Sequence, residues 1–342
     1  MKLTNLLGAA AVLFGSAVYA EGSLNIYNWS GYISDDMVKK FETETGIDVT
    51  IDTYDSNDTL LAKLQQGGGG YDIAIATQSF IPIMISEGLI QKINTDGAIN
   101  MKAILPSLQS PEWDKGNQYS IPYMWGTTNF AVNTSVYKGD INTFKILFEP
   151  PEGLQGNINI FDAASEIVPM ASIYLGVPLC SEDPTEMQKV LNLLKAQKEH
   201  VKTYSSKSGS IREALAAGEL YMSSYWSGSA MRTRGLNKDI RYAYPVEGSL
   251  AWVDNVVVPK GAKNFDNAVA FIKFLMKPEN AAMNSNSLKY HNGIQGSETL
   301  FDPALLEAPE MSVPDTSKLY FAKTCGEKAT KLVDRIWTNL LQ

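Results

Sequence analysis

The sequence from Leu250 to Pro259 is an apolar stretch of strand composition with one carboxylate, Asp254, near its middle. Burying an ionised Asp in such a stretch is costly unless a cation or hydrogen bonds compensate the charge. The flanking Trp252 supplies a π face, and a carboxylate beside an aromatic wall can hold an ammonium group by hydrogen bonding and cation–π attraction together. The alternative is that Asp254 forms an internal ion pair with a Lys or Arg of the same chain.

The sequence contains no recognisable motif for catalysis or metal binding. It contains no Gly-x-Ser-x-Gly, no His-Glu-x-x-His and no Cys-x-x-Cys motif. Its only histidines, His200 and His291, lie far apart in the chain and make a poor metal set. We therefore expect a protein that is not an enzyme and that needs no metal or cofactor. An exported hydrolase or lyase that pairs His291 with Asp254 is a competing hypothesis.

The first twenty residues are typical of an export signal. Lys2 supplies the positive charge, Leu6 to Phe14 the short apolar core, and Val18 and Ala20 the positions before a cleavage site. No later stretch offers the roughly twenty uninterrupted apolar residues of a membrane-spanning helix. We expect cleavage after Ala20 and a soluble protein exported to the periplasm.

The chain is acidic and long. Its 342 residues carry 29 Lys and Arg against 37 Asp and Glu, and removal of the signal takes away only Lys2, which brings the net charge from −8 to −9. This balance argues against nucleic acid and anionic membranes as partners and favours cationic ligands. The length exceeds what one hydrophobic core usually serves, so two domains are expected.

Stretches of strand and helix composition alternate from Ser23 onward. Helices opened by Ser34 and Ser56 separate three expected strands, which are Leu24–Tyr27, Ile47–Tyr54 and Tyr71–Ala76. This alternation predicts an α/β fold with a mainly parallel sheet, in which ligands bind beyond the carboxyl ends of the strands. Asn28–Tyr32 and Thr77–Phe80 occupy two of those ends.

The stretch Tyr119–Phe130 is strand-like, with small residues at Gly126–Thr128. We expect a break there, which suits a crossing between domains. A second set of strands and helices follows, and Asp254 then lies on a strand that returns to the first domain. The final stretch, Glu327–Leu341, has the periodicity of an amphipathic core helix.

The chain has two cysteines, Cys180 and Cys325. In the oxidising periplasm an even number of cysteines favours a disulfide. Two buried free thiols are the alternative.

Six short motifs occur in the order found in one family. They are Tyr27-Asn28-Trp29-Ser30-Gly31-Tyr32, Asp55-Ser56-Asn57, Pro122-Tyr123-Met124-Trp125-Gly126-Thr127-Thr128, Trp226-Ser227-Gly228-Ser229, Trp252-Val253-Asp254 and Tyr290. In this order the chain resembles the spermidine/putrescine-binding (polyamine) family of ABC importer solute-binding proteins, over nearly the whole mature length.

The resemblance implies a two-lobed periplasmic-binding-protein fold of type II, in which each lobe is a mainly parallel sheet flanked by helices and the ligand cleft lies between them. We expect residues 21–126 with about 255–300 in the first lobe, and residues 127–254 with about 301–342 in the second. The implied partners are a small cationic amine and an inner-membrane ABC permease, with the protein acting as a monomer.

The family's binding residues carry over to nine positions of this sequence. Trp29, Ser30 and Tyr32 would form one wall and rim, with Ser79 as a hydroxyl partner. Trp226 and Trp252 would sandwich a methylene chain, Asp254 would hold one amine, and Tyr290 would pack beside it. Glu166 falls where relatives place a carboxylate near the other amine. The physics agrees, because a diamine needs separated carboxylates and an aromatic slot between them.

Three positions depart from the family. Gly31 stands where relatives usually carry an acid, Ser229 where the diamine-binding branch has an Asp, and Ala163 where the spermidine-binding branch has an Asp. Each departure removes an amine partner, so a diamine such as putrescine fits better than trivalent spermidine.

A ligand with one amine and a neutral or anionic far end also fits this charge count. If the far end is a carboxylate, Arg232 or Arg234 could contact it, although both could instead be solvated helix charges. An iron or anion binder on the same architecture is a further hypothesis.

Overall fold

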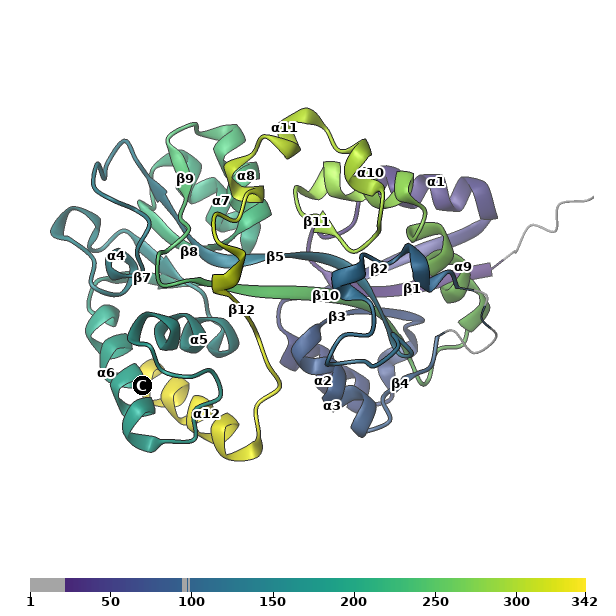
Figure 1. Cartoon of the computed structure of the whole chain (residues 1–342), viewed down its shortest axis with the longest axis horizontal. Helices are drawn as coiled ribbons and strands as arrows, with labels where there is room; N and C mark the ends of the chain where they lie inside the picture. The colour runs from purple at the N-terminus through teal and green to yellow at the C-terminus, as the bar shows by residue number, and fades with distance from the viewer. Residues whose placement is uncertain (1–21, 94–96, 98) are drawn as a thin grey trace, which may run out of the picture.

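The computed structural model describes residues 22–93, 97 and 99–342. The export signal and its expected cleavage site after Ala20 lie outside the described residues. Figure 1 shows two lobes side by side, joined by the long strands β5 (Ser120–Asn133) and β10 (Ser249–Pro259). Each lobe has its own hydrophobic core, one containing Phe41 and Phe271 and the other Phe130 and Tyr225.

The first lobe is built on three parallel strands in the order β2 (Ile47–Tyr54), β1 (Gly22–Trp29) and β3 (Ile73–Thr77), with β10 antiparallel to β3. The predicted helices between them are α1 (Asp35–Thr45) and α2 (Asn57–Gln65). The side chains of Ser34 and Ser56 cap these helices by accepting hydrogen bonds from backbone N–H groups.

The second lobe repeats this arrangement. Strands β7 (Val201–Tyr204) and β8 (Met222–Trp226) flank β6 (Ile158–Ile160) in parallel, and β8 pairs antiparallel with β5. Its helices are α5 (Ala164–Leu175), α6 (Pro184–Lys198), α7 (Ser208–Ala217) and α8 (Ser227–Leu236). The predicted α/β fold of two lobes, each with a mainly parallel sheet flanked by helices, is confirmed.

Shorter elements and the last helices complete the chain. They are α3 (Ile81–Ser86), β4 (Ile90–Gln91), α4 (Lys145–Phe148), β9 (Ile240–Tyr242), α9 (Phe265–Leu275), α10 (Pro278–Leu288), β11 (His291–Asn292), α11 (Pro303–Leu306), β12 (Leu319–Phe321) and α12 (Glu327–Leu341).

The expected break at Gly126–Thr128 is wrong, because β5 runs unbroken through it. Thr128 pairs with Leu250 of β10 on one side and with Trp226 of β8 on the other, so ladder hydrogen bonds hold the strand extended. The glycine serves packing instead. A Cβ atom on Gly126 would lie 2.9 Å from the ring of Trp252, so only glycine leaves room for that ring.

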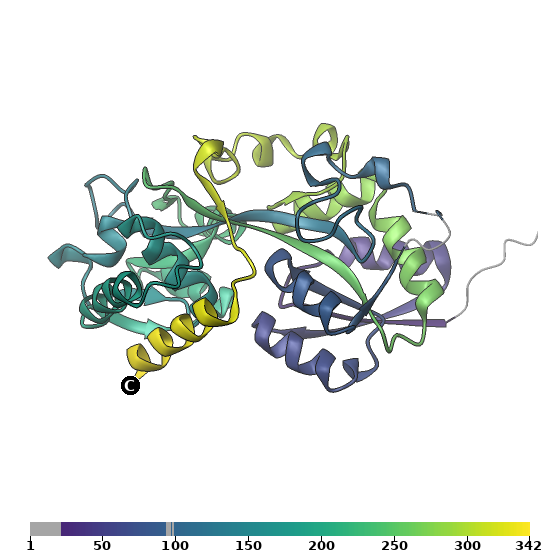
Figure 2. The same ribbon diagram turned by 60° about the horizontal axis from the view of Figure 1, so that its bottom comes forward.

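The C-terminal part of the chain returns to the second lobe. Strand β12 pairs with β10, and α12 then packs against α5 and α6, as Figure 2 shows. Ala329, Ile336 and Leu340 form its buried face, as its periodicity predicts. The predicted disulfide is confirmed: Cys180, between α5 and α6, is bonded to Cys325, just before α12.

Replacing both cysteines by Ser should destabilise the protein. The bond closes a loop with a sequence separation of 145, and on the chain-entropy model its removal lowers the free energy of unfolding by roughly 2–5 kcal/mol. Denaturant unfolding of Cys180→Ser/Cys325→Ser against the oxidised wild type measures this. Reductant should lower the stability of the wild type alone, and an equal effect of reductant on both proteins would contradict the prediction.

Candidate functional site

Strand β10 carries Asp254 between the lobes in a strand that is buried throughout. The Asp254 side chain is 6% exposed and accepts a hydrogen bond of 2.7 Å from the hydroxyl of Thr77. Asn57 in turn donates to the Thr77 oxygen at 3.0 Å, which leaves the hydroxyl proton for the carboxylate. The register of β10 shifts between Asp254 and Asn255, a bulge of the kind that re-aims side chains near functional sites.

Asp254 has no cationic partner in the described part of the chain. Among the residues that the structure describes, no Lys, Arg or His lies within ion-pair distance of its carboxylate. Burial raises the pKa of Asp254 to about 7, and this effect outweighs the hydrogen bond from Thr77 and the nearby hydroxyl of Tyr32, which lower it. The internal ion pair that was the alternative reading of Asp254 is therefore not formed in the described part of the chain.

A second carboxylate, Glu166, lies in the first turn of α5. One of its oxygens accepts hydrogen bonds from the hydroxyl of Thr128 at 2.7 Å and from the indole N–H of Trp226 at 3.0 Å. The indole of Trp252 donates to the same hydroxyl at 3.1 Å. Burial raises the pKa of Glu166 to about 7, these hydrogen bonds oppose the rise, and the nearby charge of Asp254 adds to it.

Aromatic rings from both lobes surround the two carboxylates. The rings of Tyr32, Trp252 and Tyr290 meet edge to face, with centroids 5.4–6.4 Å apart. Trp226 stacks on Phe161 at 4.2 Å. The hydroxyl of Tyr32 is buried and has no hydrogen-bond partner among the described residues. It can therefore form a hydrogen bond with a ligand.

The remaining predicted residues are less engaged. Trp29 packs on Tyr54 at 4.4 Å, and its indole N–H is buried without an acceptor among the described residues. Ser30 is exposed. Ser79 contributes its backbone carbonyl to the hydroxyl of Thr324, and no hydrogen bond joins its side chain to the rest of the set in the described chain.

Thr77 and Thr128, whose hydroxyls donate to the two carboxylates, were not among the predicted site residues. Both residues stood within motifs or strand ends that were noted, but their partners lie 177 and 38 positions away in the chain. Only the strand pairing brings them together.

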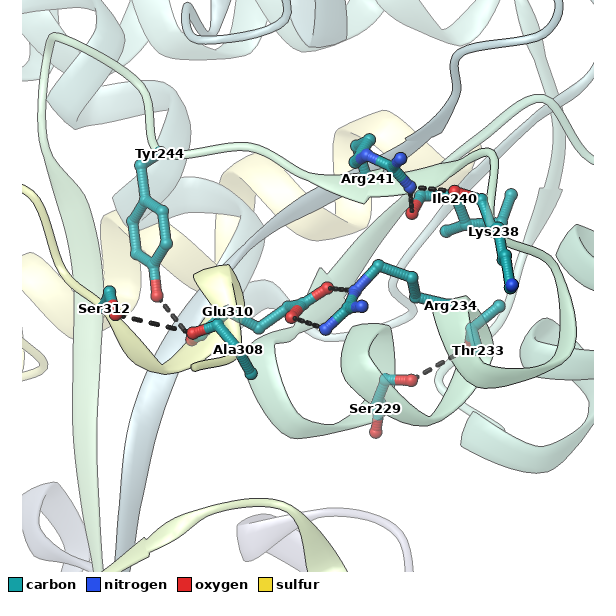
Figure 3. Close-up of polar contacts among 10 residues, drawn as sticks. All are labelled: Ser229, Thr233, Arg234, Lys238, Ile240, Arg241, Tyr244, Ala308, Glu310 and Ser312. Atoms are coloured by element: carbon teal, nitrogen blue, oxygen red, sulfur yellow. Dashed lines mark hydrogen bonds and ion pairs between the residues drawn. The ribbon is translucent and has the colours of Figure 1, made fainter. Parts of the chain in front are cut away.

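The two arginines of α8 have different surroundings. Arg234 forms a two-pronged ion pair with the buried Glu310 at 2.6 and 2.8 Å, as Figure 3 shows, so its charge is already paired within the protein. Arg232 instead lies over the ring of Tyr290, 5.9 Å from its centroid. The hydroxyl of Tyr290 lies 3.0 Å from that of Ser229 and accepts from its backbone N–H at 3.2 Å.

The competing hypotheses find little support in the described residues. His291 stacks on Trp125 at 4.2 Å and bonds the Met311 carbonyl at 3.0 Å, without a hydrogen bond to Asp254. Burial lowers the pKa of His291. In residues 22–93, 97 and 99–342 no three His, Cys, Asp or Glu side chains are grouped for a metal ion, and no helix has the length and apolarity to cross a membrane.

Comparison with known proteins shows the family of this chain. Residues 36–312 match the family model of bacterial extracellular solute-binding proteins. A putrescine/agmatine-binding protein of Pseudomonas aeruginosa is 30% identical over 99% of this chain and 97% of its own length. The spermidine/putrescine-binding periplasmic protein of Escherichia coli is 32% identical over 87% of this chain and 86% of its own.

Comparison with a solved structure shows that the fold is similar as well. The spermidine/putrescine ABC transporter substrate-binding protein of Streptococcus pneumoniae aligns with a TM-score of 0.80 and 28% identity, covering 94% of this chain and 99% of that one. The resemblance inferred from the sequence motifs is confirmed by these matches.

Stability without ligand should fall as the pH rises from about 4 to 7. Both carboxyl groups have a pKa of about 7 in the fold, above their ordinary values of 3.8 and 4.5, so the folded protein binds more protons than the unfolded chain in this window. Asp254→Asn should therefore gain stability relative to wild type across it, by up to about 4 kcal/mol. Urea unfolding of ligand-free protein at pH 4 to 8 measures the difference. A difference that does not change with pH would show that Asp254 ionises as it does in water.

Proposed function

The chain belongs to the bacterial extracellular solute-binding proteins, and we propose that it binds a small organic amine between its lobes and delivers it to an inner-membrane ABC permease. One observation carries the proposal: the buried Asp254 and the half-buried Glu166 share an aromatic surround and have no cation partner among the described residues. A bound ammonium supplies the missing charge. The named relatives bind putrescine, agmatine or spermidine, which are amines of this kind.

The contacts that a ligand amine would make follow from the geometry. A carboxylate that accepts from Thr77 keeps lone pairs for an N⁺–H donor, and such charge-assisted bonds are about twice as strong as neutral ones. The rings of Trp252, Trp226 and Tyr290 offer faces and edges to a methylene chain and to the cation. Within this proposal the ligand contacts are Trp29, Ser30, Tyr32, Ser79, Glu166, Trp226, Trp252, Asp254 and Tyr290.

Binding would be coupled to hinge closure. Asp254 belongs to a strand that pairs with the first lobe's sheet, whereas Glu166 and Trp226 belong to the second lobe. A ligand that contacts both lobes shifts the population towards the closed form, which a permease can recognise.

The protein would act in the periplasm, as a monomer and without catalysing a reaction. The division into residues 21–126 with 255–300 and 127–254 with 301–342 stays a prediction.

The affinity of Asp254→Asn tests the proposal. The change keeps the shape of the side chain but leaves the ligand ammonium without its counter-ion, which costs roughly 3–5 kcal/mol, or about two to three and a half decades in affinity. Calorimetric titration with putrescine, using protein refolded from denaturant to remove bound solute, measures this loss. Asp48→Asn is the control, because Asp48 is exposed on β2 and should bind as wild type does. Unchanged affinity in Asp254→Asn would reject this site for the amine.

A further inference from the structure

A second polar group lies beside the amine site, where α7 and α8 begin. Its members, which we call the serine–arginine cluster, are Ser208, Arg212, Ser229 and Arg232. The hydroxyls of Ser208 and Ser229 lie 2.9 Å apart, and Arg232 donates to Ser229 at 3.1 Å. The charges of Arg232 and Arg212 both act on the hydroxyl of Tyr225, where they oppose the rise in its pKa that burial causes.

The arginines of this cluster lack acidic partners. No carboxylate of the described residues lies within ion-pair distance of Arg232 or Arg212. The Nε atom of Arg232 is in addition buried without an acceptor. Arg234, two residues further along the same helix, shows the contrast, because its guanidinium is paired with Glu310 by two hydrogen bonds (Figure 3). A half-buried guanidinium with an unpaired N–H donor can bind an anion.

The surrounding backbone favours negative charge as well. The ten-residue helices α7 and α8 both begin without a side-chain cap and without an acidic residue in the first turn. The positive ends of their helix dipoles therefore add to the potential of the arginines, although the N–H of Ser229 already donates to Tyr290.

Tyr290 connects this cluster to the amine site. Its hydroxyl forms a hydrogen bond with Ser229, and Arg232 lies over its ring. The same ring also packs edge to face against Trp252 and Tyr32. No ion pair joins Arg232 to Asp254 or Glu166 among the described residues, and Tyr290 lies between the arginine and Trp252 in this series of contacts.

We propose that the preferred ligand is a zwitterionic ω-amino carboxylate, with its ammonium at Asp254 and Glu166 and its carboxylate at Arg232 and Ser229. The inference rests on the proposed amine-binding function and narrows the ligand class. A diamine that extends from these carboxylates towards the serine–arginine cluster would place its second ammonium against Arg232. An ω-amino carboxylate satisfies both ends.

Three ligands with four methylenes and different far ends test this directly. They are putrescine, 5-aminopentanoate and 5-aminopentanamide, which end in an ammonium, a carboxylate and a neutral amide. The same end groups on three-, five- and six-methylene chains remove the dependence on one length. At the best length, calorimetry of refolded wild-type protein should give the carboxylate roughly 10- to 100-fold tighter binding than the diamine, since like charges are penalised at a desolvated contact.

Arg232→Gln should abolish this preference, weakening the carboxylate ligand while leaving the diamine unchanged or improved. Arg232→Lys should keep it in part, because the charge remains. Arg241→Gln is the matched control, since Arg241 is exposed on β9 and bonds only nearby backbone carbonyls. Melting of each ligand-free variant shows that it is folded.

The outcomes separate the two proposals. A diamine or amide that binds wild type as tightly as the carboxylate, or an equal loss for all three ligands in Arg232→Gln, overturns the zwitterion proposal and leaves the amine site intact. Failure of every amine ligand to bind, or unchanged binding in Asp254→Asn, overturns the amine-binding function itself.

Discussion

Asp254 and Glu166 are held in an apolar surround by hydroxyl and indole donors, not by cations. Hydrogen bonds alone do not offset the desolvation cost of a charge. Burial therefore raises the pKa of both groups to about 7. The folded protein with both groups ionised therefore carries a desolvation cost, which protonation or a bound cation removes. Two separate hydrophobic cores and a disulfide in the second lobe supply the stability that tolerates it.

The long strands β5 and β10 make this arrangement possible. Their pairing fixes Trp252 opposite Gly126 and lets the indole reach Thr128, which in turn binds Glu166 of the other lobe. The hydrogen-bond chain from β10 to α5 thus crosses between the lobes through a single threonine hydroxyl. Closure can use this chain as its contact point because both of its ends are already oriented.

The sequence predicts local features well, and it predicts contacts between distant positions of the chain poorly. The caps at Ser34 and Ser56 and the amphipathic face of α12 depend on neighbouring residues, so their patterns are readable. The break expected in β5 was wrong because ladder pairing overrides the weak strand preference of Gly126. Asp254 was recognisable from its apolar context, whereas the pairing of Arg234 with Glu310 depends on a contact between positions 76 apart.

Selectivity in such a site comes from the groups that a wrong ligand leaves unpaired. A neutral solute would leave Asp254 and Glu166 desolvated without a cation, so the cost already present in the empty protein would remain. An anion would add repulsion to that cost. Within the proposed site, a ligand with one ammonium compensates the charge of the carboxylates. Arg232 then acts on the far end of the ligand, where its positive charge disfavours a second cation. The same fold could therefore change its ligand class through one residue on α8 while the contacts to the first amine stay as they are.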